Sequence, residues 1–123
     1  MTTKPTLETD YVRSLMQRTS LELRDVRLFR RNVGVVKLED RVFRASLPGQ
    51  CDVWIVGRGG WYGELEIKRF GALSSSQLHW RDWCAEWGVP WNCLAARREE
   101  SMSQTVDRWM KEIRLWLPNR LVS

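Results

Sequence analysis

Two strand-like segments joined by a glycine-rich connection constrain the fold of this chain more than any other feature. Residues 51–56 and 61–68 are rich in β-branched and aromatic residues, and three of the four residues between them are glycine. Such a combination favours a β-hairpin. In residues 64–68, charged and apolar side chains alternate, so the two sets project from opposite faces of a strand. We therefore predict a hairpin that buries one face and carries charge on the other.

The remainder of the chain alternates between helical and strand patterns. Thr6 is a suitable N-cap for a first helix of about three turns, whose apolar residues start at Tyr11. Strands are predicted at residues 25–31, 41–45 and 91–96, and helices between Ser74–Ser76 and Gly88 and over 106–117. The order is helix, three or four strands, helix, strand, helix. With 43% apolar residues in 123 positions, one α/β domain spanning 1–123 is expected.

Charge and cysteine content narrow the class of protein. Lys and Arg outnumber Asp and Glu by 20 to 15, a net charge of +5 that favours a polyanionic partner. There is no apolar run of the roughly 20 residues that a membrane helix needs, so we expect a cytoplasmic protein without a membrane partner. Cys51, Cys84 and Cys93 are irregularly spaced, which favours reduced thiols. A zinc site made of these thiols and His79 is an alternative, although C-x-x-C spacing is missing.

Acidic side chains on the predicted hairpin suggest a catalytic site that binds a metal ion. Asp52 begins the first strand, and the short connection would place it beside Glu66 across the ladder. Two close carboxylates raise each other's pKa unless a cation intervenes, which favours a hard metal ion such as Mg²⁺ or Mn²⁺. With Lys68 nearby, such a site suits phosphodiester hydrolysis. The alternative for the alternating charges alone is a solvated strand face, and Glu64 is expected to be a surface charge.

Five short segments, taken in order, resemble the PD-(D/E)XK nuclease superfamily, and more closely the small stand-alone VRR-NUC proteins of phages. The resemblance covers nearly the whole chain. It implies a restriction-endonuclease-like αβββαβ core, with a central mixed sheet flanked by helices and an extra C-terminal helix. Cys51 departs from the pattern, because the superfamily name has proline there. The matching segments are Leu28-Phe-Arg-Arg-Asn-Val-Gly34, Leu47-Pro-Gly-Gln-Cys-Asp52, Gly63-Glu-Leu-Glu-Ile-Lys68, Leu73-Ser-Ser-Ser-Gln77 and the helix end at Gly88.

The resemblance also implies a role for individual residues. Asp52 and Glu66 would ligate the metal together with the backbone carbonyl of Ile67. Lys68 would orient or activate the attacking water, and Gln77 would support the site. A further family carboxylate lies on the first helix; Glu8 has the better helical phase, and Glu22 is the competing assignment.

The leading hypothesis is a homodimeric, Mg²⁺- or Mn²⁺-dependent endodeoxyribonuclease that cuts branched DNA such as Holliday junctions inside a phage-infected or bacterial cell. Phosphate contacts are expected from arginines in the predicted strands at 25–31 and 41–45, with no organic cofactor. One alternative is a catalytically silent nucleic-acid-binding module of the same fold. Another is an interaction protein that binds neither metal nor DNA. The arginines are Arg30, Arg31, Arg41 and Arg44.

Tryptophan is unusually frequent, with eight residues. Aromatic residues beside basic ones can stack on unpaired bases, but helical spacing favours core packing for several of these. Trp61 and Trp116 are expected to be free for an interface. The tryptophans expected in the core are Trp80, Trp83, Trp87 and Trp109.

Overall fold

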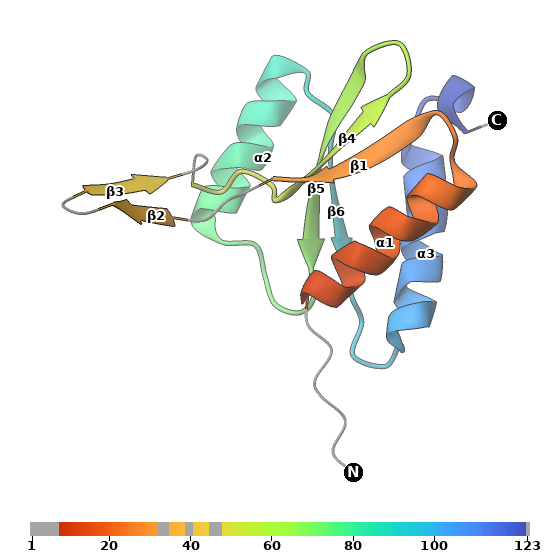
Figure 1. Ribbon diagram of the computed structural model, residues 1–123, viewed down its shortest axis with the longest axis horizontal. Helices are drawn as coiled ribbons and strands as arrows, with labels where there is room; N and C mark the ends of the chain where they lie inside the picture. Colours follow the sequence, from red (N-terminus) through yellow and green to blue (C-terminus); the bar gives the residue numbers. More distant parts are fainter. Residues whose placement is uncertain (1–7, 32–34, 39–40, 45–47, 123) are drawn as a thin grey trace.

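The computed structural model describes residues 8–31, 35–38, 41–44 and 48–122, and for 35–38 and 41–44 it describes the backbone only. Three helices and two sheets make up this part of the chain (Figure 1). The elements are α1 (Glu8–Glu22), β1 (Val26–Arg30), β2 (Val35–Leu38), β3 (Arg41–Arg44), β4 (Val53–Gly57), β5 (Trp61–Lys68), α2 (Ser75–Trp87), β6 (Trp91–Ala95), α3 (Met102–Trp116) and the 3-10 turn η1 (Asn119–Leu121).

The main sheet is mixed. Its strand order is β1-β4-β5-β6, in which β5 pairs antiparallel with β4 and parallel with β6. Together with α1 and α2, these strands form the expected αβββαβ core, and α3 is the extra C-terminal helix. The predicted fold class is confirmed. Strands β2 and β3 form a separate two-stranded sheet, in a region where the sequence pattern predicted only the second of them.

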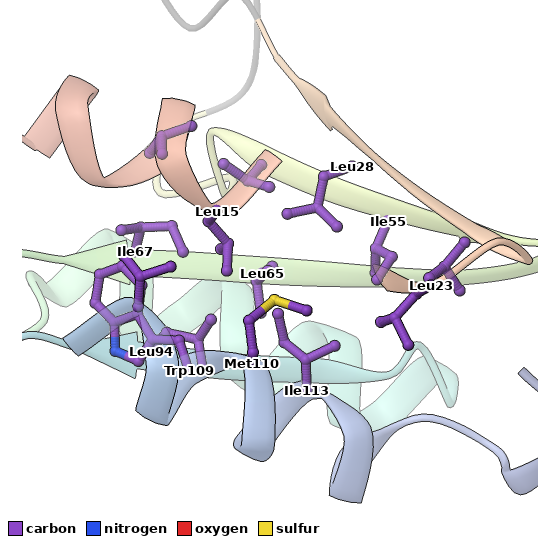
Figure 2. Packing of buried hydrophobic residues seen from close by; sticks show 14 of the residues in the cluster. Leu15, Leu23, Leu28, Ile55, Leu65, Ile67, Leu94, Trp109, Met110 and Ile113 are labelled. Carbon is purple, nitrogen blue, oxygen red and sulfur yellow. The ribbon is translucent and has the colours of Figure 1, made fainter. Parts of the chain in front are cut away.

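Helices cover both faces of the main sheet. Figure 1 shows α1 and α3 side by side on one face and α2 on the other. The hydrophobic core lies between the sheet and the α1–α3 layer, where Leu65 and Ile67 of β5 meet Trp109 and Met110 of α3 (Figure 2). These residues are buried, so the apolar half of the alternating pattern contributes to the core as predicted.

The predicted hairpin is formed by β4 and β5. Val53 pairs with Leu65, and continuing this register by one residue puts Asp52 opposite Glu66. The alternative of a solvated strand face is wrong, as is the expected exposure of Glu64, because α2 lies over this face. Glu64 is 1% exposed and Glu66 is 5% exposed.

Caps define both ends of α2. Ser74 is the N-cap: its hydroxyl accepts a hydrogen bond from the Gln77 backbone N–H, and the Gln77 side chain accepts one from the Ser74 N–H. Gly88 ends the helix in the left-handed conformation, with φ of 71°. Both ends agree with the sequence prediction. No helix in the described part of the chain is long and apolar enough to cross a bilayer.

The tryptophans of α2 do not lie where the helical spacing predicted. Trp109 of α3 is in the core, but Trp83 and Trp87 are 42% and 68% exposed. Only the small side chain of Cys84 is buried among the α2 residues, so the rings lie along one flank of the helix and stack on one another. Trp61 and Trp116, which we expected to be free for an interface, are partly buried, and their rings pack edge to face at 5.2 Å against the core.

Candidate active site

Three carboxylates from separate elements converge at one end of the main sheet. Glu8 is the first residue of α1, Asp52 immediately precedes β4, and Glu66 lies on β5. Glu66 interacts electrostatically with both of the other carboxylates, and Asp52 also acts on Glu8. Of the two candidates on the first helix, Glu8 is therefore the one beside Asp52. Glu22 lies at the far end of α1, in ion pairs with Arg18 and Arg114 at 2.7 Å and 3.0 Å.

Desolvation makes these carboxyl groups weaker acids, although only Glu66 is buried, while Asp52 is half-buried and Glu8 lies at the surface. Desolvation raises the pKa of Glu66 to about 7, and the neighbouring Asp52 contributes in the same direction. Desolvation likewise raises the pKa of Asp52 and of Glu8. The Oδ1 atom of Asp52 is buried and has no hydrogen-bond partner among the described residues. A site of this kind favours either a proton or a cation between its carboxylates.

Cationic and polar groups surround the carboxylates. Lys68 lowers the pKa of Glu8, Asp52 and Glu66, so its ammonium group lies close to the whole cluster. The Gln77 amide donates a hydrogen bond to Oε1 of Glu66 at 2.9 Å. The Lys68 carbonyl accepts a hydrogen bond from Ala96, toward β6. Because successive carbonyls along a strand point to opposite sides, the Ile67 carbonyl points toward the start of β4 and Asp52.

A close backbone contact holds the loop before β4 against α2. Gly49 has φ of 81°, and a Cβ atom at this position would lie 2.0 Å from the carbonyl oxygen of Ser76. Only glycine allows this approach. The Pro-Gly pair that the sequence indicated as a strand breaker therefore also brings Asp52 and the first turn of α2 together.

The residues present fit a hard divalent cation that is shared with water and substrate. No three acidic, cysteine or histidine side chains among the described residues are grouped to hold an ion by themselves. The zinc alternative therefore has no support, since Cys51 and Cys84 are buried as separate free thiols. Mg²⁺ typically binds through one or two carboxylates, with substrate phosphates and water completing its shell. Asp52, with its unpartnered oxygen, and Glu66 provide that number.

Two neighbours of the site were not expected from the sequence. The thiol of Cys51 is buried beside Glu66 and lowers the pKa of that carboxyl. The residue that stands where the superfamily name has proline therefore contacts the candidate site directly. Its position next to Asp52 was the only sequence signal. The backbone N–H of Arg69 interacts with Glu8 and favours its ionised form.

Glu64 is a buried ion-pair partner and not the expected surface charge. The Arg31 guanidinium lies 3.0 Å from its carboxylate, and the two side chains are 17% and 1% exposed. Arg31 also donates hydrogen bonds to the Cys51 carbonyl at 2.6 Å and to the Tyr62 hydroxyl at 3.0 Å. This position gives Arg31 a structural role. The alternating pattern alone could not show that α2 would cover the outer face of β5.

Arg30 is the described arginine best placed to contact a substrate at the site. It is exposed, it lowers the pKa of Asp52 and Glu8, and it donates a long hydrogen bond of 3.5 Å to Thr9. The side chains of Arg41 and Arg44, which the sequence suggested as phosphate contacts, lie outside the described residues.

Comparison with known proteins does not show a family for this chain. No family model, no curated protein and no solved structure matches the chain. The family resemblance therefore depends on the short segments and on the residues that the fold brings together.

Proposed function

We propose that this protein is a metal-dependent endodeoxyribonuclease of the VRR-NUC type that cuts branched DNA. The observation that carries the proposal is the convergence of Glu8, Asp52 and Glu66 beside Lys68 and Gln77. These residues come from α1, the start of β4, β5 and α2, so the whole core fold is required to assemble them. A set of mutually repelling carboxylates, of which Glu66 is buried, with a lysine at its edge suits phosphodiester hydrolysis better than it suits stability.

Each residue has a chemical task in this proposal. Asp52, Glu66 and the Ile67 carbonyl would hold Mg²⁺ or Mn²⁺. The bound ion would polarise the phosphoryl group and lower the pKa of a bound water. Lys68 would orient that water and stabilise the negative charge that develops on phosphate oxygens. Gln77 would keep the Glu66 carboxylate in one orientation, and Glu8 would add negative charge at the edge of the site.

DNA would be held chiefly through its phosphates. Arg30 is exposed beside the carboxylates, and Arg41 and Arg44 belong to the separate β2–β3 sheet. Their contacts would position the duplex arms without reading sequence, and binding would weaken steeply with salt. The proposed acting form is a homodimer, which would present two active sites to a two-fold symmetric junction. The exposed rings of Trp83 and Trp87 offer apolar surface for such pairing.

A cleavage assay tests the proposal directly. Four-way-junction DNA would be incubated with Mn²⁺ and either the wild-type protein, Asp52→Asn or Lys68→Met. We expect cleavage by the wild type and its near-complete loss in both variants. Undiminished cutting by the variants would refute the assignment. Circular dichroism would verify that both variants are folded.

The competing hypothesis, a binding module without catalysis, makes a different prediction. Isothermal titration with Mn²⁺ should detect metal uptake by the wild type and none by Asp52→Asn if the site is a metal centre. A protein that binds junction DNA with the same affinity in both forms, takes up no Mn²⁺ and leaves the DNA intact would be such a module.

A further inference from the structure

A row of three aromatic rings crosses the face of the main sheet that is turned away from the α1–α3 layer. Phe29 of β1 and Trp54 of β4 are directly paired across the ladder, and their rings stack with centroids 4.7 Å apart at an angle of 25°. Tyr62 of β5 continues the row, with its ring 5.9 Å from that of Trp54. One ring from each of three adjacent strands therefore forms a continuous surface.

The row is not part of the hydrophobic core. Leu28 and Ile55, the strand neighbours that point the other way, fill the core, whereas Phe29 is 43% exposed and Tyr62 is 36% exposed. The main contacts of α2 with the sheet are with β6 and with the Glu66 side chain of β5. Within the described part of the chain, this half of the sheet face therefore presents the partly exposed rings of Phe29 and Tyr62 to solvent.

One end of the row opens into a basic pocket of about 260 Å³. Phe29 and its neighbour Val56 line it together with Arg24, Arg27 and Arg58. Two of these guanidinium groups are held in place. Arg58 bonds to the Asp25 carboxylate at 2.8 Å, and Arg27 donates to backbone carbonyls at the end of α1. Three cations against the single carboxylate of Asp25 favour an anionic ligand.

The middle ring of the row, that of Trp54, lies on the strand that leads to the candidate active site. Trp54 and Asp52 lie two residues apart on the same face of the β4 chain segment, a separation of about 7 Å at the strand rise of ~3.3 Å per residue. A ligand that follows β4 would pass from the basic pocket over the rings to the carboxylates.

We propose that this row binds unpaired nucleotides of the DNA substrate. The inference deepens the proposed nuclease function and depends on it for the substrate class. Exposed rings beside cations provide the two contacts that a single strand needs, base stacking and phosphate attraction. Bases inside a duplex stack on each other and expose only their edges, so the row would select the unpaired region of a branched substrate. That selection would direct a strand end or splayed junction toward Asp52 and Glu66.

A measurement of DNA binding under conditions that prevent cleavage tests the inference. Fluorescence anisotropy would measure the affinity of the full chain, in EDTA, for labelled oligothymidylate and for an abasic strand of the same length. The two strands carry the same phosphates, so any preference for thymidylate reports contact with bases. We expect a preference of about tenfold in the wild type. It should disappear in Phe29→Leu, which keeps an apolar side chain, and persist in Phe29→Trp, which keeps a ring.

Leu115→Ala is the matched control, because Leu115 is 88% exposed on α3, behind the other face of the sheet. This variant should retain the preference. Equal affinity of the wild type for the two strands would overturn the inference. So would a change of oligomeric state in Phe29→Leu without a change in strand preference, since the row would then be a contact between copies of the chain. Loss of DNA cleavage with the strand preference intact would instead count against the proposed nuclease function alone.

Discussion

The side-chain amide of Gln77 donates a hydrogen bond to Oε1 of Glu66 at 2.9 Å while its carbonyl oxygen accepts one from the Ser74 backbone. One side chain thus caps α2 and orients a carboxylate of the candidate active site. The chain contains a second capping box of the same type, in which Ser101 and Gln104 begin α3. The two glutamines form the same local bonds, and within the described part of the chain only Gln77 also bonds to a carboxylate of the candidate site.

This pair separates the structural role of Gln77 from its role at the site. Gln77→Ala and Gln104→Ala should each lose the capping bond and about 0.5–1 kcal/mol of unfolding free energy. Only Gln77→Ala should also reduce junction cleavage, by about 10- to 100-fold, because Glu66 loses the donor that orients it. Urea unfolding and initial cleavage rates would measure the two effects. Equal cleavage by the two variants would show that Gln77 is only a cap.

The two glutamates of α1 provide a second matched comparison. Glu8→Gln removes a carboxylate beside Asp52, and we expect cleavage to fall by about 10- to 100-fold. Glu22→Gln disrupts partly exposed ion pairs with Arg18 and Arg114, so it should cost no more than about 1 kcal/mol and leave the rate unchanged. Initial rates at saturating Mn²⁺ and thermal melts would test both. A slower Glu22→Gln beside a normal Glu8→Gln would reverse the assignment.

The raised pKa of Glu66 predicts how stability depends on pH in the metal-free protein. Its pKa is about 7 in the folded state against a usual value of 4.5. Between these values the folded protein binds more protons than the unfolded chain, so this residue lowers the unfolding free energy as pH rises. Glu66→Gln should therefore be more stable than the wild type above about pH 7, by up to roughly 3 kcal/mol, and nearly equal to it near pH 4.

Urea unfolding in EDTA at several pH values would measure this difference, and added Mn²⁺ should stabilise the wild type but not Glu66→Gln. The variant will keep some pH dependence, because the pKa values of Asp52 and Glu8 are also raised. A difference between the two proteins that does not change with pH would contradict the prediction.

Arg30 and Arg31 are adjacent, but we expect Arg31 to contribute to stability and Arg30 to contribute to DNA binding. Arg31→Met leaves the Glu64 carboxylate buried without its partner, so we expect a loss of about 3 kcal/mol or more at neutral pH. The loss should be smaller in acid, where Glu64 is protonated. Arg30→Met removes an exposed side chain, and stability should change by less than about 0.5 kcal/mol.

For DNA binding, we expect the larger effect from Arg30→Met and the smaller one from Arg31→Met. Arg30→Met should weaken junction binding in EDTA and reduce the slope of log affinity against log salt by about one unit. Arg31→Met, measured at a temperature where it is folded, should keep the wild-type slope. If the slope changes only in Arg31→Met, Arg31 and not Arg30 contacts phosphate.

Much of the candidate site could be predicted from local sequence. The alternation in residues 64–68 and the glycine-rich connection before them specify the β4–β5 register, and this register places Asp52 opposite Glu66. A hairpin is a short-range structure, so its alternating pattern and its turn are determined by residues that are close in sequence. The same holds for the Ser74 and Ser101 caps, since a capping box involves only four consecutive positions.

Only the tertiary structure decided which element covers each face of a strand or helix. Periodicity shows which side chains share a face of a strand or helix, but it does not show which element packs against that face. Glu64 is buried with Arg31 because α2 lies over β5, and Trp83 is exposed because Cys84 is the α2 residue turned into the protein. Helical phase favoured Glu8 over Glu22, but only packing sets the start of α1 beside Asp52. Burial and charge pairing between distant segments are collective properties of the packed chain, and no local pattern encodes them.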